Sequence, residues 1–211
     1  MLPFVPIECR RVLDVGCSSG GFGQTLKRNR SVEVWGVEPV AAVAAVAATR
    51  LDRVIESAFT PALDLPKASF DCVIFNDVLE HIFDPAASLR LARGLLTPQG
   101  CIVASIPNVR HFPTIWELVV RGNWTYRDFG ILDRTHLRFF TRNSIEPLFA
   151  EAGFSVEKLE GINQFWTVHR EETPRWRVFR IINRLTRGRI NDMSFLQFAV
   201  VARPNANHSA D

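Results

Sequence analysis

The stretch VLDVGCSSGGFG, residues 12–23, decides the fold. It consists of a short apolar run interrupted by one acidic residue, Asp14, and then a loop of small residues. An apolar run that ends in Gly and Ser is typical of a buried strand that turns directly into a helix. Small residues let a ligand approach the backbone closely, so this turn is a candidate binding site.

Two familiar phosphate-binding loops do not match this turn. A P-loop ends in a lysine, and no lysine follows here. A dinucleotide fingerprint needs three glycines in the order G-x-G-x-x-G, and Ser18 stands at the middle position. The carboxylate of Asp14 would also repel a pyrophosphate bound beside it. A nucleoside that has a cationic end and no phosphate fits better, as in S-adenosylmethionine (SAM), whose carboxylate can meet the N–H groups at the helix start.

A second acidic residue supports this interpretation. Glu38 ends the next apolar stretch, VWGVEP, about 20 residues after the loop, where an acid can accept hydrogen bonds from both ribose hydroxyls. Any nucleoside cofactor could use Glu38 alone. The combination of Asp14 and Glu38 indicates SAM.

Strand-like and helix-like segments alternate along most of the chain, which predicts a parallel sheet covered by helices on both faces. Asp84 and Pro85 are expected to cap one of the helices, as its N-cap and its first residue. The expected strands are residues 10–16, 32–39, 52–57, 70–77, 100–108, 154–162 and 193–203, and the expected helices are residues 21–29, 39–50, 84–96 and 141–153.

The sequence resembles the class I SAM-dependent methyltransferases. VLDVGCSSGGFG is similar to their first motif, VWGVEP to their second, FDCVIFNDVLEHIFDP to their fourth-strand motif, and LLTPQGCIVASIPN to the helix, turn and strand that follow. The resemblance spans Val12 to Asn108 in the order and spacing of the family. It implies a Rossmann-like three-layer α/β sandwich, with a mostly parallel seven-stranded sheet and an antiparallel last strand. One domain is expected over residues 1–203, with a disordered tail at 204–211.

The resemblance also implies roles for individual residues. Those expected to bind the cofactor lie in the first loop and at the ends of the following strands: Asp14, Gly16, Cys17, Ser18 and Gly20 for the methionine part, Glu38 for the ribose, Ser57, Ala58 and Phe59 near the adenine, and Asn76 and Asp77 at the sulfonium end. Many relatives have an acid near position 57. Because this chain has Ser57, the adenine contact is expected from backbone or from stacking on Phe59.

The alternation breaks between residues 107 and 142, where the acceptor is expected to bind beyond the carboxyl ends of the strands. His111 and His136 are candidate general bases, since a hydroxyl acceptor must lose a proton and His titrates near neutral pH. Asp133 could orient His136; a weak metal site and an ion-paired turn with Arg134 or Arg138 are alternatives. We expect no resident metal, and an orienting or capping role for Glu80 and His81.

The same segment, GNWTYRDFGILDRTHLRFFT, resembles a subgroup associated with bacterial surface polysaccharide and other sugar assembly. That resemblance implies a sugar or glycan hydroxyl as acceptor. A quinone or polyketide O- or C-methyltransferase and a catalytically inactive SAM-binding interaction module are the alternatives. Trp116, Trp124 and Phe139 either stack on the acceptor or pack the segment against the sheet.

Residues 170–190 form an Arg-rich insertion. Arg177, Arg180, Arg184 and Arg187 share one face of a predicted helix, next to a stripe of Val178, Ile181, Ile182 and Leu185. Residues 174–189 could contact an anionic membrane, or form a surface helix with its apolar side inward, or belong to a homodimer interface. A nucleic-acid partner is not expected, because the net charge is only +3 and no RNA module is recognised.

The four cysteines, Cys9, Cys17, Cys72 and Cys101, lack the spacing of a metal site. We expect buried free thiols in a reducing compartment. The first residues do not read as a signal peptide, and no apolar run is long enough to cross a bilayer. The sequence therefore predicts a cytoplasmic enzyme.

Overall fold

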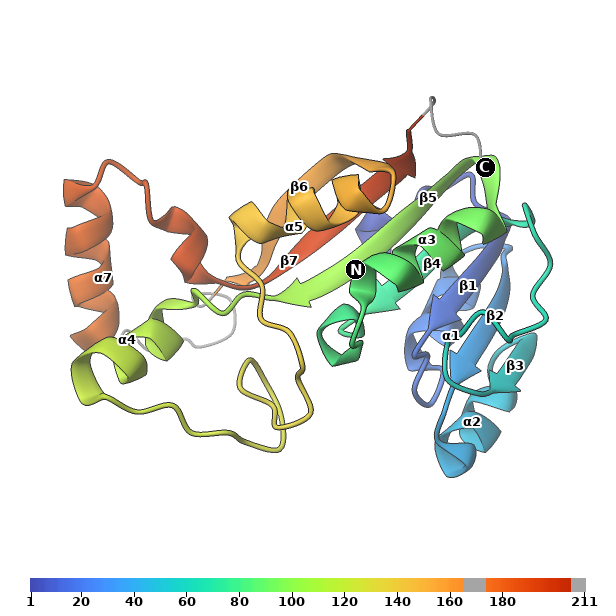
Figure 1. The fold of residues 1–211 in the computed structure, drawn as a ribbon, viewed down its shortest axis with the longest axis horizontal. Coiled ribbons are helices and arrows are strands. Elements are labelled where there is room, and N and C mark those ends of the chain that lie inside the picture. Colours follow the sequence, from blue (N-terminus) through green and yellow to red (C-terminus); the bar gives the residue numbers. More distant parts are fainter. Residues whose placement is uncertain (165–173, 206–211) are drawn as a thin grey trace.

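The computed structural model describes residues 1–164 and 174–205. Its centre is a seven-stranded sheet in the order β3-β2-β1-β4-β5-β7-β6 (Figure 1). β7 runs antiparallel to both of its neighbours, β5 and β6, and the other neighbouring strands are parallel. The strands are β1 Arg11–Val15, β2 Glu33–Glu38, β3 Arg53–Glu56, β4 Phe70–Asn76, β5 Leu96–Pro107, β6 Phe154–Gln164 and β7 Phe195–Pro204. The predicted fold class, including the antiparallel last strand, is confirmed.

The four helices expected from the alternation begin and end close to the predicted positions, whereas the helix over residues 112–121 lies in the segment 107–142, where no helix was predicted. The helices are α1 Gly21–Asn29, α2 Ala41–Ala48, α3 Pro85–Leu95, α4 Phe112–Arg121, α5 Arg142–Glu151 and α7 Pro174–Leu185, with short 3-10 turns η1 Leu2–Phe4, η2 Leu79–His81 and η3 Asn191–Ser194. Asp84 caps α3 as predicted, since its side chain accepts a hydrogen bond of 2.9 Å from the N–H of Ala87. Caps of this kind satisfy backbone groups that the first turn leaves unpaired.

Two apolar clusters cover the two faces of the sheet. On one face, α3 and α5 contribute Leu89 and Phe149 to a cluster with side chains of the central strands. On the other face, α1 and α2 contribute Leu26 and Ala47. Successive residues of a strand point to opposite faces, so each central strand supplies both clusters. This is the predicted three-layer sandwich.

A third, separate cluster holds the inserted helices together. Phe112 of α4 packs against Trp176 and Phe179 of α7, and Met193 of η3 completes the cluster. Figure 1 shows α4 and α7 side by side at one end of the molecule, beyond the strands. We define this part as the α4–α7 cap.

The structure distinguishes between the orientations that the sequence left open for the Arg-rich helix. Trp176 and Phe179 face inward, whereas the predicted apolar stripe does not: Ile181 is 61% exposed and Leu185 is 77% exposed. Both aromatic side chains pack against Phe112 of α4, and these contacts decide which side of the helix is covered.

The remaining predictions concern the cysteines and the termini. All four cysteines are buried and free, as predicted. Residues 170–173 of the insertion and residues 206–211 of the predicted tail lie outside the described residues. Among the residues described, no helix has the length and apolar character needed to cross a membrane.

Candidate cofactor and acceptor site

The loop between β1 and α1 depends on backbone conformations that favour glycine. Gly16 has a φ of +65° and Gly20, the N-cap of α1, a φ of +76°. A Cβ on Gly16 would lie 2.7 Å from Cγ2 of Val78, and a Cβ on Gly20 would lie 3.2 Å from Cα of Ala47. The small residues therefore let the loop pack closely against the chain after β4 and against α2.

Asp14 is a buried acid at the end of β1. The residue is 2% exposed, and its Oδ2 has no hydrogen-bond partner among the described residues. Burial raises the pKa of its carboxyl group to about 7, because the charged form loses its hydration. An unpaired buried carboxylate needs a cationic donor. The ammonium group of SAM is such a donor, so this residue fits the cofactor that the sequence indicates.

Glu38 has a further role that the sequence did not predict. Its Oε2 accepts a hydrogen bond of 3.0 Å from the N–H of Ser18, and its Oε1 accepts one of 3.0 Å from the N–H of Val40. The carboxylate thus fixes the first loop against the end of β2. Each carboxylate oxygen has two lone pairs, so the ribose hydroxyls can still be bound.

The side chain of Cys17 is turned away from the ligand side of the loop. Its Sγ donates to the carbonyl of Ser18 at 3.6 Å, and the side chain is buried on the core side of the loop. A Cβ on Gly36 of β2 would lie 2.5 Å from this Sγ, which shows how closely the thiol packs on that strand. A contact of Cys17 with the cofactor would therefore be made by its backbone, and it stays a prediction.

The residues expected near the adenine follow β3. The N–H of Ser57 donates to the carbonyl of Glu38 at 3.1 Å, and its hydroxyl donates to the carbonyl of Ala58 at 3.1 Å. The ring of Phe59 meets the edge of Phe75 at a centroid distance of 5.8 Å. The hydroxyl of Ser57 is therefore used locally, and stacking of the adenine on Phe59 stays a prediction.

The end of β4 supplies a second buried oxygen atom that has no hydrogen-bond partner among the described residues. Oδ1 of Asn76 is buried without a partner in the described parts of the chain. Asp77 follows with a φ of +53°, and its Oδ1 accepts hydrogen bonds from Ser105 at 3.1 Å and from Gln197 at 2.5 Å. Because β1 and β4 are parallel neighbours, the oxygens of Asp14 and Asn76 lie at the same edge of the sheet. This edge has acceptors for the ammonium and for the polarised groups around the sulfonium.

A buried acid and two histidines meet beside this edge. Glu80 is 1% exposed, and both its carboxyl oxygens lack a hydrogen-bond partner within residues 1–164 and 174–205. Burial raises its pKa to about 8. Its Oε1 lies 3.9 Å from Nε2 of His136, and the rings of His136 and His81 are 4.6 Å apart. Burial also lowers the pKa of His136, which favours the neutral imidazole.

Asp133 supports a different histidine from the one predicted. Its Oδ1 accepts hydrogen bonds from the N–H of Thr135 at 2.8 Å and from its hydroxyl at 2.6 Å. Thr135 in turn contacts Nδ1 of His81 at 3.0 Å. His136 instead places its Nδ1 3.0 Å from the carbonyl of Ile131. Glu80 and His81 follow closely after a strand that ends at the site, and this position was the signal in the sequence for their place beside His136.

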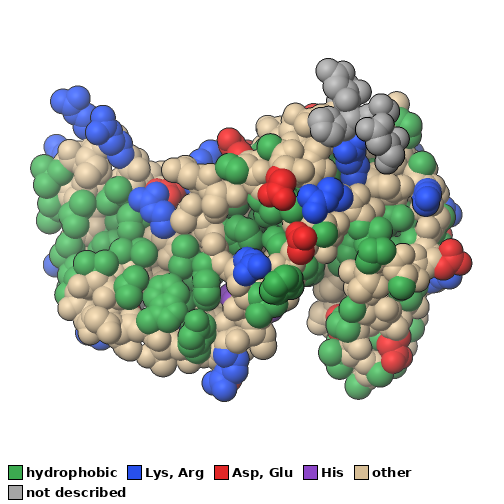
Figure 2. Space-filling view, viewed as in Figure 1, with side chains coloured by type: hydrophobic (Ala, Val, Ile, Leu, Met, Phe, Trp, Pro, Cys, Tyr) green, Lys and Arg blue, Asp and Glu red, His purple; other side chains and the backbone are tan. Residues whose placement is uncertain are grey.

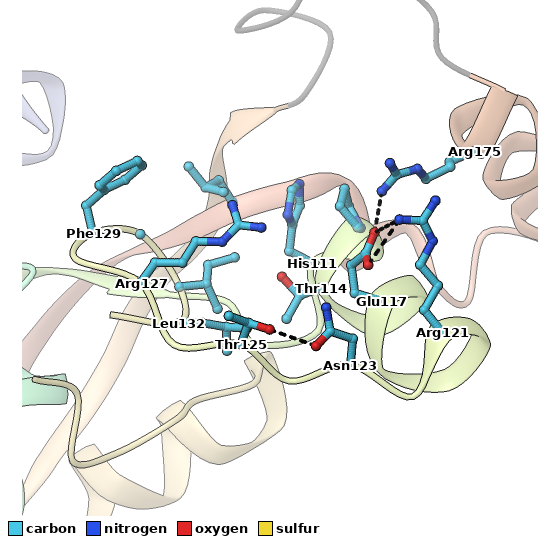
Figure 3. Close-up of a pocket in the computed structure, with 14 residues that line it drawn as sticks. His111, Thr114, Glu117, Arg121, Asn123, Thr125, Arg127, Phe129, Leu132 and Arg175 are labelled. Carbon is cyan, nitrogen blue, oxygen red and sulfur yellow. Dashed lines mark hydrogen bonds and ion pairs between the residues drawn. The ribbon is translucent and has the colours of Figure 1, made fainter. Parts of the chain in front are cut away.

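His111 lines a cavity of about 730 Å³ between the α4–α7 cap and the loop that follows α4 (Figure 3). Arg127 extends into this cavity, and Glu117 pairs there with Arg175 at 2.8 Å and with Arg121 at 3.4 Å. Ile131, whose carbonyl contacts His136, lines the same cavity. Ile131 therefore links the cavity to the acid–histidine cluster, although Glu80, His81 and His136 are not among the residues that line the cavity.

The structure separates the two predicted bases and explains the aromatic residues. The ring of His111 packs against Trp176 at 5.9 Å, whereas His136 packs against His81. Trp116 packs on Phe112 inside the cap, and Trp124 meets Phe139 edge to face at 5.6 Å. These contacts favour packing over acceptor stacking for the aromatic side chains.

Comparison with known proteins agrees with this geometry. Residues 3–159 match a family model described as a methyltransferase domain. The ubiquinone biosynthesis O-methyltransferase of Cereibacter sphaeroides (strain ATCC 17025) is 29% identical over 163 residues, which are 75% of this chain and 65% of that protein. The protein of the same name from Azorhizobium caulinodans is 26% identical over 74% of this chain and 63% of its own length. The aligned part is less than two thirds of these relatives.

Solved structures share the fold. A SAM-dependent methyltransferase from Archaeoglobus fulgidus superposes with a TM-score of 0.68 at 21% identity, covering 95% of this chain and 88% of that one. One from Mesorhizobium loti has a TM-score of 0.62 at 20% identity, with 95% and 94% covered. The curated relatives described above are named for a quinone pathway, so they do not support the resemblance to the sugar subgroup. The chain belongs to the methyltransferase-domain family and has the seven-stranded fold of these SAM-dependent neighbours.

Proposed function

We propose that this protein transfers the methyl group of SAM to a hydroxyl of a small-molecule acceptor, and that a phenol or quinol ring suits the site better than a sugar. The observation that carries this proposal is the cavity of about 730 Å³ that Ile131 links to the acid–histidine cluster. Apolar side chains occupy much of its wall, among them Pro113, Phe129, Ile131, Leu132 and Leu196. Such a wall favours a flat apolar ring. The names of the curated relatives point the same way.

Each of the cofactor-binding residues contacts a different part of SAM in this proposal. Asp14 binds the ammonium group, the N–H groups of the first loop bind the carboxylate, and Glu38 binds the ribose. When bound, SAM supplies a methyl group already activated on a sulfonium, so the protein needs mainly to align the acceptor and accept its proton.

His136 is the better placed general base. Its imidazole is buried, with a side chain 5% exposed, and its Nδ1 is engaged by the carbonyl of Ile131. Nε2 is then the basic nitrogen, and it would take the hydroxyl proton as the acceptor oxygen gains the methyl group and SAM leaves as S-adenosylhomocysteine. The resulting imidazolium lies 3.9 Å from Oε1 of Glu80, and its positive charge favours the ionised form of that carboxyl group. His111 lines the outer cavity and is the second candidate.

A nucleotide-sugar hydroxyl is the second candidate acceptor, because the cavity also carries positive charge. Arg121, Arg127 and Arg175 line it with Glu117 as the acid among its lining residues. Two of the arginines pair with Glu117, whereas Arg127 has no ion-pair partner among the residues that the structure describes. Arginine binds phosphate well, so Arg127 could hold the diphosphate of such a substrate.

The test is a panel of acceptors incubated with SAM, with product mass and S-adenosylhomocysteine as readouts. We expect a mass gain of one methylene unit on phenols and catechols that carry an apolar chain, and none on nucleoside diphosphate sugars. Methylation of nucleoside diphosphate sugars and not of phenols would identify a sugar as the acceptor in place of a phenol. Tight SAM binding without turnover on any acceptor would contradict the enzyme assignment and favour a SAM-binding interaction module.

His136→Gln and His111→Gln form a matched pair in this assay. Loss of turnover with retained SAM affinity in His136→Gln, and not in His111→Gln, is the expected result. Full activity of His136→Gln together with loss in His111→Gln would assign the base to His111.

A further inference from the structure

We propose that Glu80, His81 and His136 form a binding site for one divalent transition-metal ion beside the cofactor site. The three residues each offer a ligand atom, and these atoms lie within 4.8 Å of one another. Glu80 and His81 come from η2, and His136 comes from the loop that leads into α5. The site thus joins two segments that are more than fifty residues apart in the chain.

The contacts of His136 determine which of its nitrogens is available. Its Nδ1 lies 3.0 Å from the carbonyl oxygen of Ile131, and a carbonyl oxygen can only accept a hydrogen bond. Nδ1 therefore carries the proton of the neutral ring. The lone pair is left on Nε2, which is the atom that lies 3.9 Å from Oε1 of Glu80.

The contacts of Thr135 determine in the same way which nitrogen of His81 carries the proton. The hydroxyl of Thr135 donates to Oδ1 of Asp133 at 2.6 Å, so its proton is already used. The 3.0 Å contact between this hydroxyl oxygen and Nδ1 of His81 must then have the imidazole as donor. In the neutral ring, Nε2 of His81 also keeps its lone pair.

Three acceptor groups therefore converge, with no donor supplied by the described residues around the carboxyl oxygens of Glu80. Buried acceptors are almost always satisfied in native proteins. A proton between Glu80 and His136 would satisfy one pair, whereas a metal ion would satisfy all three groups. Metal-bound histidines usually donate their other N–H to a carbonyl or, directly or indirectly, to a carboxylate, and Ile131 and the Thr135–Asp133 pair provide these partners here.

The ligand types select the class of metal. Two imidazole nitrogens and one carboxylate oxygen suit Zn²⁺, Fe²⁺ or Co²⁺, whereas Mg²⁺ and Ca²⁺ prefer oxygen ligands. Bonds of about 2.0 to 2.1 Å around Zn²⁺ would place neighbouring ligand atoms about 3.4 Å apart. The present 3.9 Å between Glu80 and His136 needs to shorten by about half an ångström to reach that value, and ligand atoms as far as 4.8 Å apart would have to approach by up to about 1.4 Å.

Three protein ligands leave a coordination position open, as in catalytic rather than structural metal sites. This part of the inference rests on the proposed function: an acceptor hydroxyl bound at the open position would lose its proton more readily. His136 would then act as a metal ligand and not as the general base.

The experiment is a titration of chelator-treated, full-length protein with Co²⁺, followed by the visible absorption of the bound ion. We expect one equivalent to bind, Zn²⁺ to displace it, and a large excess of Mg²⁺ to leave it in place. His81→Gln should weaken Co²⁺ binding at least tenfold, and because His81 is exposed this variant should fold normally. Glu80→Gln and His136→Gln should do the same, while His111→Gln serves as the matched control with unchanged binding. Asp133→Asn should weaken binding about 10- to 100-fold, through His81.

Absence of Co²⁺ binding to the wild-type protein, or equal binding by all these variants, would overturn the metal site. Because the readout is absorption, it does not depend on turnover. Methyl transfer by a protein that binds no metal would overturn this inference and leave the proposed function standing. Metal binding without methyl transfer to any acceptor would support the metal site and contradict the proposed function.

Discussion

The carboxyl group of Asp14 is buried, and in the protein without cofactor its charged form is not stabilised by a partner among the described residues. Its pKa is raised from the ordinary 3.8 to about 7 by burial. The folded state therefore binds this proton more tightly than the unfolded state. The stability from the neutral form is complete below about pH 4 and is lost as pH rises through about 7.

Because the pKa of Asp14 is raised, the pH dependence of stability can be predicted for the protein without cofactor. Asp14→Asn removes the titrating group, so the variant should gain stability relative to wild type as pH rises from 5 to 8. Urea unfolding at several pH values measures the difference between the two proteins. Parallel profiles would show that Asp14 keeps an ordinary pKa.

Cofactor binding should show the opposite dependence on the same group. The ammonium of SAM favours ionised Asp14, so SAM affinity should fall below about pH 7, by at most tenfold per pH unit. Calorimetry between pH 5.5 and 8 tests this expectation. In Asp14→Asn, affinity should be weaker at pH 8 and nearly independent of pH across that range.

The carboxylate of Glu38 fixes the first loop, and we expect it to bind the ribose of SAM as well. Glu38→Ala should weaken SAM binding by about 1.5 to 3 kcal/mol, since it removes charged hydrogen bonds to the ribose and to the loop. Glu33→Gln on the same strand is the control, because Glu33 pairs with Arg11 at 2.7 Å, away from the loop. Wild-type affinity in a folded Glu38→Ala variant would remove this residue from the site.

At the scale of elements, the loop between β1 and α1 depends on Gly16. Gly16→Ala should destabilise the protein by about 1 to 3 kcal/mol, because alanine must adopt a positive φ and its Cβ meets Val78 at 2.7 Å. Gly21→Ala, at the start of α1, is the matched control: a Cβ there meets nothing within 4 Å. Urea unfolding compares the two, and equal stabilities would contradict the role assigned to Gly16.

The strands and most helices could be predicted because their signals are local. Apolar runs, Asp84 before Pro85 and the spacing of the motifs each involve neighbouring residues. The partners of Asp133 could not be predicted in this way, because Thr135 meets His81 across 54 residues. The side of α7 that is covered depends on Phe112 of α4, and that contact too is not visible from helical periodicity.

At the scale of the whole molecule, the α4–α7 cap presents an uncovered apolar surface next to basic residues. Leu118, Val119 and Val120 of α4 and Ile181, Ile182 and Leu185 of α7 are exposed. Arg184 and Arg187 are exposed beside them. Figure 2 shows hydrophobic side chains gathered over this end, with basic side chains at its upper edge. The combination fits an anionic lipid surface.

The prediction is co-sedimentation with vesicles that contain anionic phosphatidylglycerol, and little with vesicles of neutral phosphatidylcholine. Replacing Ile181 and Leu185 with serine should reduce binding severalfold, and added salt should weaken it. Absence of binding together with a dimer in size-exclusion chromatography would assign the surface to a second copy of the chain.

The sequence predicts the cofactor side of the site better than the acceptor side. Asp14, Glu38 and Asn76 end strands whose order follows from the fold, so their proximity could be inferred. The cavity is formed by α4, α7 and an irregular loop that approach one another only through tertiary contacts. For that reason the sequence placed both His111 and His136 near the acceptor without showing that they lie in different surroundings.

The central claim is that the edge of the sheet at Asp14 accepts a cationic nucleoside without phosphates and rejects a dinucleotide. Calorimetric titration of the wild-type protein with SAM and with NAD, under the same buffer at pH 8, tests it most directly. We expect SAM to bind and NAD to give no measurable binding. Binding of NAD with no binding of SAM would contradict the account.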